Sequence, residues 1–291
     1  MTGPIAVLLE DKRRLHLQHG PIDLIIEADG RPDEVAAAYQ QATGRFENVL
    51  AELVEELPIL RRQCPAEGLG LEGPVARRME RAVCLHAPKF ITPMAAVAGA
   101  VADEILGAMT AGRTLSRAYV NNGGDIALWL APGEEFLIGL VPIPQVPELA
   151  GKAVIKASDP VRGVATSGRH GRSLSFGIAD AVTVLAADAA SADAAATLIA
   201  NAVDLPGDAA VARLPANEID PDSDLGERMV TVDVGSLTAG QINQALVAGQ
   251  ARAADLHTGG LVAAAVIMLN GQIRAVGKAA RRALPVEPAF A

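Results

Sequence analysis

Two arginines and a histidine lie within four residues of the stretch GVATSGRHGRS, residues 163–173. The guanidinium groups of Arg169 and Arg172 can clamp phosphate oxygens in a bidentate fashion. His170 can donate a hydrogen bond or exchange a proton near neutral pH. The preceding residues supply hydroxyls and a permissive backbone: Thr166, Ser167 and Gly168. The stretch predicts one wall of a phosphate site, and the alternative is a solvated basic loop.

A second candidate is the turn in YVNNGGDIAL, residues 119–128, where apolar strand signals flank two asparagines and two glycines. Gly123 and Gly124 carry no side chains and allow positive φ, so a ligand can approach the backbone closely. Asn122 precedes them and offers an amide. The alternative is an ordinary hairpin turn, because Asn-Gly and Gly-Gly are its strongest local signals.

A third candidate lies in ADAAAT, residues 192–197, within a predicted helix. Asp193 and Thr197 are four residues apart, so their side chains share one side of the helix. A carboxylate and a hydroxyl suit Mg²⁺, which takes hard oxygen ligands and is often held by few protein groups. The alternative is a polar helix face, since Asp is favoured near a helix N-terminus.

Together, four segments resemble the successive core motifs of the ApbE superfamily, which includes the Mg²⁺-dependent FAD:protein FMN transferases. The segments are MAAVAGAVADEI (94–105), VNNGGDIAL (120–128), GVATSG (163–168) and ADAVTVLAADAASADAAAT (179–197). The last is the most specific, because a strand is followed by A-D-A-x-x-T on a helix. The sequence is similar to a branch whose members are named only as uncharacterised proteins.

The resemblance implies an α+β fold of the ApbE type, in one domain over residues 1–291, and an FAD site whose pyrophosphate lies beside Mg²⁺. It assigns Asp193 and Thr197 to the metal. Its cofactor-binding residues, with Asn122 and Arg172 added from the patterns above, are Gly99, Asp103, Asn122, Gly123, Gly124, Thr166, Ser167, Gly168 and Arg172. Asp193, His170 and Arg169 are the candidate catalytic residues.

The sequence departs from the family at two places. The family's Lys in the helix K-G-x-x-x-D is Ala98 here, and no His-Ile-x-Asp-Pro stretch follows Thr-Ser-Gly. The short basic loop stands in its place. Four hypotheses follow: FMN transfer from FAD to a Thr of a target protein, non-catalytic binding of a flavin or another phosphorylated ligand, a different enzyme on the same fold, and a structural protein with a relict site.

Helices are expected to position these residues at 33–57, 75–86, 92–112, 189–203 and 238–254. Strands are expected at 5–9, 22–28, 117–121, 125–131, 136–142, 153–157, 161–166, 178–187, 229–234 and in a pair near 261–276. Thr92 is a predicted cap, Pro58 a predicted helix end, and residues 205–228 a predicted long loop. Strands in runs without regular βαβ alternation favour α+β layers.

The composition excludes several classes of function. The chain has 291 residues, 50% hydrophobic, and a net charge of −9, which argues against a nucleic-acid or anionic-membrane surface. Cys64 and Cys84 are expected to be reduced thiols. Acidic residues interrupt the apolar stretches 93–109 and 178–203, so no membrane span is expected. At the N-terminus the charges follow a short apolar run, the opposite of the order in a signal peptide, so none is expected. We expect a cytoplasmic protein that binds a small phosphorylated ligand, with a target protein and a homo-oligomer as possible partners.

Overall fold

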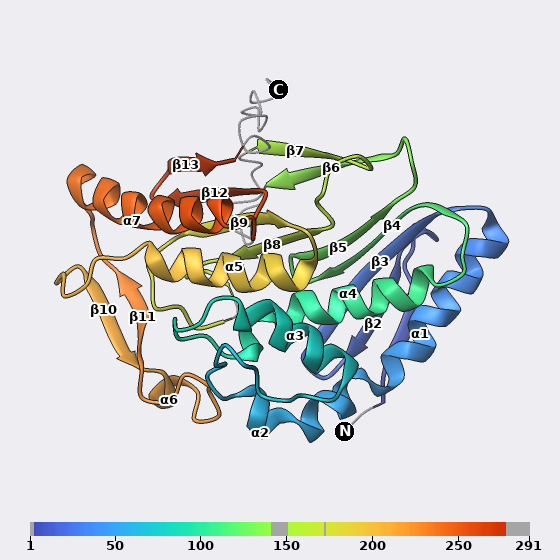
Figure 1. The fold of residues 1–291 in the computed structure, drawn as a ribbon, viewed down its shortest axis with the longest axis horizontal. Helices are drawn as coiled ribbons and strands as arrows, with labels where there is room; N and C mark the ends of the chain where they lie inside the picture. Colours follow the sequence, from blue (N-terminus) through green and yellow to red (C-terminus); the bar gives the residue numbers. More distant parts are fainter. Residues whose placement is uncertain (1–2, 141–150, 172, 278–291) are drawn as a thin grey trace. The chain divides into compact units, whose positions relative to one another are not determined.

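The computed structural model of the chain describes residues 3–140, 151–171 and 173–277. Figure 1 shows the order of its elements. The chain divides into two compact units. The first unit comprises Met1–Glu135, Lys156–Ala165 and Ala186–Ala194, and the second comprises Phe136–Ile155, Thr166–Leu185 and Ala195–Ala291. The expected single domain over residues 1–291 stays a prediction.

An antiparallel sheet forms the core of the first unit. Its strands are β1 (Ile5–Leu8), β2 (Leu15–His19), β3 (Ile22–Gly30), β4 (Leu115–Asn122), β5 (Asp125–Leu130) and the start of β8 (Gly163–Ser167), paired in that order. Buried and partly exposed side chains alternate along β3, so one face of the sheet is apolar.

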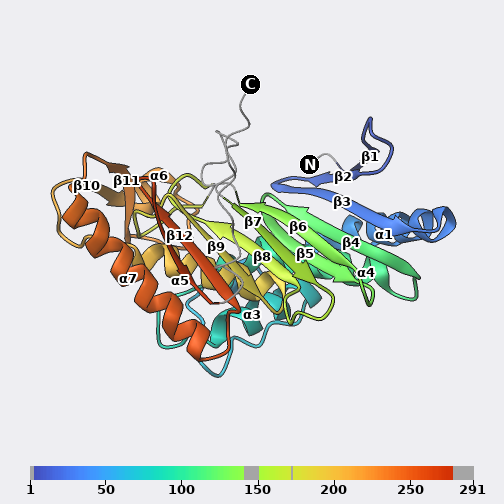
Figure 2. The same cartoon turned by 90° about the horizontal axis from the view of Figure 1, so that it is seen from above.

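Helices cover that apolar face (Figure 2). The helical elements of this unit are α1 (Pro32–Glu55), α2 (Leu57–Leu60), α3 (Pro74–Cys84), the 3₁₀ turn η1 (Pro93–Ala96), α4 (Val97–Thr110) and the start of α5 (Ala189–Ala202). α1 packs on β2 and β3, and α4 packs on β4 and β5. Because aromatic residues are 3% of the chain, the core consists mainly of Ala, Val, Leu and Ile.

The second unit is built around β9 (Ala181–Ala186), β12 (Ala264–Leu269) and β13 (Gln272–Val276), next to the end of β8. Every residue of β9 and β12 is buried, as expected for central strands. α7 (Ala239–Thr258) packs on β12 and β13. Two further hairpins are β6 (Glu135–Leu140) with β7 (Gly151–Lys156), and β10 (Val211–Pro215) with β11 (Met229–Val234), joined by α6 (Ala216–Ile219).

The α+β class is confirmed, and most predicted elements are present within a few residues. Residues 205–228 were wrongly predicted to be loop only, because β10 and α6 lie within them. Pro58 does not end α1, which stops at Glu55, but occupies the first turn of α2. Thr92 makes no side-chain cap. Instead, a short 3₁₀ turn leads into α4, and a carboxylate that is distant in the sequence accepts a hydrogen bond from the first turn of α4, as described below.

The expectation of reduced thiols is wrong for this structure. Cys64 and Cys84 form a disulfide, with their Cα atoms 5.6 Å apart. The bond ties the segment after α2 to the end of α3. Disulfides are rare in cytosolic proteins, so the expected cytoplasmic location stays a prediction. No helix within the described residues is long and apolar enough to cross a membrane.

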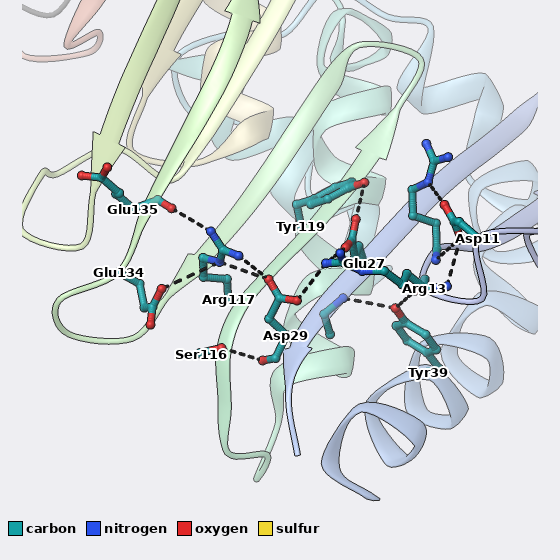
Figure 3. A network of polar contacts seen from close by, with 12 residues as sticks. Asp11, Arg13, Glu27, Asp29, Tyr39, Ser116, Arg117, Tyr119, Glu134 and Glu135 are labelled. Atoms are coloured by element: carbon teal, nitrogen blue, oxygen red, sulfur yellow. Dashed lines mark hydrogen bonds and ion pairs between the residues drawn. The ribbon is translucent and has the colours of Figure 1, made fainter. Parts of the chain in front are cut away.

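A polar network joins β3 and β4 in the first unit (Figure 3). Arg117 pairs with Asp29 at 2.6 Å, and Arg13 pairs with Glu27 at 2.6 Å. Burial, and then the Glu27 carboxylate, raise the pKa of Tyr119 to about 12. These groups are partly exposed, so each ion pair contributes at most about 1 kcal/mol. The network contains none of the predicted site residues.

Candidate functional site

The predicted site residues fall in both units. Gly99 and Asp103 lie on α4, Asn122, Gly123 and Gly124 lie at the β4–β5 turn, and Asp193 lies near the start of α5, all in the first unit. The second unit holds Thr166, Ser167, Gly168, Arg169, His170 and Thr197. Arg172 lies outside the described residues. The structure brings the first-unit residues together around the crossing of α4 and α5.

At this crossing each helix is capped by a carboxylate from the other. The N–H of Gly99, in the first turn of α4, donates to Oδ2 of Asp193 at 3.1 Å. In return Asp103 accepts from the N–H groups of Ala189 and Ala190, at 3.0 and 2.9 Å, in the first turn of α5. First-turn N–H groups have no partner within their own helix. Reciprocal capping therefore satisfies donors at both N-termini.

Two glycines allow this close approach. A Cβ at Gly99 would lie 2.2 Å from the carbonyl oxygen of Ala189, and a Cβ at Gly163 would lie 2.0 Å from that of Asp188. Both contacts are with backbone, which cannot rotate away. The start of α5 is therefore seated directly against α4 and β8. Gly99, predicted as a cofactor-binding residue, therefore also has a packing role, because its missing side chain lets α5 approach α4.

Carboxylates gather around the crossing. Burial, followed by the charges of Asp125 and Asp103, raises the pKa of Asp193 well above its usual value, although the N–H groups of Gly99 and Ala98 act in the opposite direction. Burial likewise raises the pKa of Asp103 to about 6, against the two N–H bonds that it accepts. Negative charge at this place is costly without a cation.

The β4–β5 turn adds amides and open backbone to the same region. Asn122 and Asp125 pair across the hairpin and so point to one face of the sheet. On that face the side-chain amide of Asn122 donates to the carbonyl of Ala98 at 3.1 Å. Gly123 and Gly124 have φ of 65° and 114°, and no atom lies within 4 Å of a Cβ built on either. The segment is a hairpin turn, and its glycines leave room for a ligand.

α5 presents few polar positions. Between residues 191 and 200 the partly exposed residues are Ser191, Asp193 and Thr197, while the others are buried. Asp193 and Thr197 are one turn apart on the same side of this helix, as predicted. The described residues contain no group of three or more His, Cys, Asp or Glu side chains placed to hold a metal ion. A cation here would therefore complete its coordination with oxygens of water or of a ligand.

In the second unit the basic loop is tied to one carboxylate. Arg169 donates from Nε and Nη2 to Oδ1 of Asp180, at 3.0 and 2.8 Å, and Nε2 of His170 lies 3.4 Å from the same oxygen. The N–H of Arg169 donates to the carbonyl of Ala179 at 2.9 Å. Arg169 thus already has a structural anion partner, which the prediction of a phosphate clamp did not include.

The segments on either side of this loop are also held. Upstream, the hydroxyls of Thr166 and Thr183 lie 2.9 Å apart, between β8 and β9. Downstream, the N–H of Phe176 donates to Asn201 at 3.0 Å, and its carbonyl accepts from Arg213 and Thr231. The loop is therefore anchored on both sides by side chains of neighbouring elements.

Sequence reasoning missed three residues that organise these places. Asp125 belongs to the quoted turn, but its approach to Asp193 depends on the hairpin register. Gly163 begins GVATSG and carries a backbone contact that no local pattern signals. Asp180 precedes an apolar strand and resembles any solvated carboxylate in the sequence. In the sequence, only the adjacent basic side chains of Arg169 and His170 indicated that an acidic partner would lie nearby.

The model of the family described as AbpE bacteria matches residues 6–275. A UPF0280 protein from Methanopyrus kandleri is 36% identical over 181 residues, covering 62% of this chain and 69% of that protein. One from Methanothrix thermoacetophila is 39% identical over 138 residues, covering 45% of this chain and 52% of that protein. The chain thus spans about half the length of the latter relative.

Among solved structures, a mutant of the flavin transferase ApbE from Vibrio cholerae matches with a TM-score of 0.50 and 12% identity, covering 92% of this chain and 98% of that chain. At that identity the likeness concerns the fold alone, which agrees with the α+β architecture described above. Together with the family match over residues 6–275, it confirms the predicted resemblance: this chain belongs to the AbpE bacterial family and has an ApbE-like fold.

Proposed function

We propose that the protein binds a phosphorylated ligand, FAD or a related flavin, together with Mg²⁺, at the α4–α5 crossing. One observation supports this most strongly. Asp193 is a partly exposed carboxylate at this crossing, on a helix with few other polar positions, and the charges of Asp125 and Asp103 add to partial burial in raising its pKa. A cation would relieve the mutual repulsion of these groups and lower the pKa of Asp193.

The donor set fits Mg²⁺. Asp193 offers carboxylate oxygens and Thr197 a hydroxyl, and both are hard donors. Mg²⁺ is commonly held by one or two carboxylates and by phosphate oxygens of its ligand. When bound, the ion would neutralise charge on a pyrophosphate. The open turn at Gly123 and Gly124 then offers room for the ligand, while the N–H of Gly124 donates to Oδ1 of Asn121 at 2.8 Å.

Transfer of FMN to a Thr of a target protein is the enzymatic form of this proposal. In it Asp193 would assist deprotonation of the attacking Thr hydroxyl, the new bond to the phosphorus of FMN would form as the pyrophosphate bond of FAD breaks, and AMP would leave. Phosphoryl transfer depends mainly on positioning and charge stabilisation, so a small set of residues suffices.

A non-catalytic flavin carrier is the second candidate, and one observation favours it. Asp180 already neutralises Arg169 and faces His170, and the position of the family's Lys is Ala98. Two of the three predicted catalytic residues, Arg169 and His170, therefore already face an anion, and an apolar residue stands in place of the family's Lys. A carrier needs only the metal and the ligand site.

Fluorescence titration with FAD, with and without Mg²⁺, tests the shared part of the proposal, and AMP release separates its two forms. We expect Mg²⁺ to strengthen FAD binding and Asp193→Asn to abolish that dependence. Asp188→Asn is the matched control, because Asp188 caps Ser191 at 2.7 Å and Asn is an equally good cap. An affinity for FAD that is the same with and without Mg²⁺, and the same in Asp193→Asn as in wild type, would overturn the proposal.

AMP release together with flavin that stays on a Thr-containing target after denaturation would identify a transferase. Flavin that is lost on denaturation, without AMP, would identify a carrier. No affinity for FAD in either condition would show that the fold serves another ligand.

A further inference from the structure

Asp103 was expected to contact the cofactor, but its contacts describe a different role. Its two carboxylate oxygens accept from two successive N–H groups, of Ala189 and Ala190. Those groups begin α5, the helix that carries Asp193 four residues after Ala189. Both oxygens of Asp103 are therefore already used to hold the backbone of α5.

The return contact closes a ring between the two helices. Asp193 on α5 accepts from Gly99 on α4, and Asp103 lies one turn beyond Gly99 on the same helix. The backbone of Gly99 and that of Ala189 approach too closely for any Cβ between them. The helix crossing and the two carboxylate caps thus form one unit, in which moving the start of α5 also moves Asp193.

The geometry points to Asp103 as a positioning residue: by fixing the first turn of α5, it holds the Asp193 carboxylate at the N-terminus of α4. This inference rests on the proposed function for its consequence, the affinity for Mg²⁺. Its structural part, the coupling between the two caps, is independent of any ligand. The two parts are therefore tested by different measurements.

Amide hydrogen exchange tests the coupling in the ligand-free protein. Asp103→Asn removes one acceptor, so the amides of Ala189 and Ala190 should exchange faster. Because Asp193 then loses its fixed position, the amide of Gly99 should also exchange faster, by about tenfold for a loss of about 1.4 kcal/mol. Asp188→Asn, the cap control, should leave Gly99 unchanged. Normal protection of Gly99 in Asp103→Asn would overturn the inference.

Calorimetric titration with Mg²⁺ alone tests the consequence. Supporting partners of metal ligands are worth about tenfold or more in metal affinity, so we expect about tenfold weaker binding in Asp103→Asn. In the Asp193→Asn background the same change should add nothing, since Asp103 acts through Asp193. Additive losses would make Asp103 an independent ligand and overturn its positioning role.

The two failures are distinguishable. If the wild-type protein binds neither Mg²⁺ nor FAD, the proposed function fails, while the exchange of Gly99 still decides whether the caps are coupled. If Asp103→Asn alone does not fold, the same measurements are made in the Gly107→Ala background. That substitution adds helix propensity at an exposed position of α4.

Discussion

Replacing Gly99 with alanine tests the α4–α5 crossing most directly. The new Cβ would lie 2.2 Å from the carbonyl oxygen of Ala189 and 2.7 Å from the nitrogen of Ala190. Non-bonded carbon and oxygen atoms rest at about 3.5 Å. Because the obstructing atoms are backbone, no rotamer change relieves the overlap. The first turn of α5 has to move away from α4 by about 1 Å.

Such overpacking costs about 1–3 kcal/mol. The same shift stretches the 3.1 Å bond from Gly99 to Asp193 beyond hydrogen-bond distance, and leaving a buried donor unsatisfied costs about 1–3 kcal/mol. The better helix propensity of alanine offsets up to about 1 kcal/mol of this loss of stability. We therefore expect Gly99→Ala to lower the free energy of unfolding of the first unit by about 3 kcal/mol.

Gly107 provides the matched control within α4. A Cβ there would meet only Nη2 of Arg78, at 3.7 Å, which is an ordinary contact. Gly107→Ala should therefore stabilise the helix by up to about 1 kcal/mol. The same chemical change is thus expected to have opposite signs at two positions of one helix.

Urea unfolding followed by tryptophan fluorescence measures both variants. Trp129 is the single tryptophan of the chain and lies on β5 in the first unit, so the signal reports that unit. If Gly99→Ala proves as stable as wild type, or as stable as Gly107→Ala, the close approach of α4 and α5 is refuted.

Three further predictions concern other parts of the chain. Asp103 has a folded pKa of about 6 against an ordinary 3.8, so the folded state favours its protonated form. The resulting contribution to the free energy of unfolding is complete below pH 4 and is lost as the pH rises through 6. Wild-type protein should lose about 3 kcal/mol more than Asp103→Asn between pH 4 and 7, and parallel urea-stability profiles of the two proteins would contradict this. The disulfide should protect Cys64 and Cys84 from alkylation until a reductant is added, and its reduction should cost about 3 kcal/mol; alkylation of the native protein without reductant, read by mass spectrometry, would disprove the bond. Arg169→Ala should lower stability by about 1–3 kcal/mol because Asp180 loses its main partner; unchanged thermal unfolding combined with lost FAD binding would instead make Arg169 a ligand clamp.

Much of the fold could be predicted because its signals are local. The helix over α5 follows from its alanines, and the strand before it from a continuous apolar run. The β4–β5 hairpin follows from Gly123 and Gly124, which supply the positive φ that a two-residue turn requires. β10 and α6 were missed because their Pro- and Asp-rich surroundings resemble loop, while tertiary contacts overrode local preference.

Within the candidate site the sequence could identify residue types and helical spacing but not partners. Asp193 and Thr197 share a helix face because of the 3.6-residue repeat, whatever surrounds them. Asp103, predicted as a cofactor residue, is used to cap a helix that begins 86 residues later. Arg169, predicted as a phosphate clamp, is paired with Asp180. Neither partner is signalled by spacing along the chain.

The sequence by itself determined the family, the α+β class and the positions of Gly99, Asp193 and the hairpin glycines, because short motifs carry that information. Only the tertiary structure decided that Gly99 and Gly163 must lack a side chain, because the backbone at the start of α5 lies against both. It also decided that Asp103 and Asp193 cap each other's helices, and that the charge of Asp125 acts on Asp193 and raises its pKa. Burial and Coulomb energy depend on which distant segments meet in space, and that is a property of the packed chain.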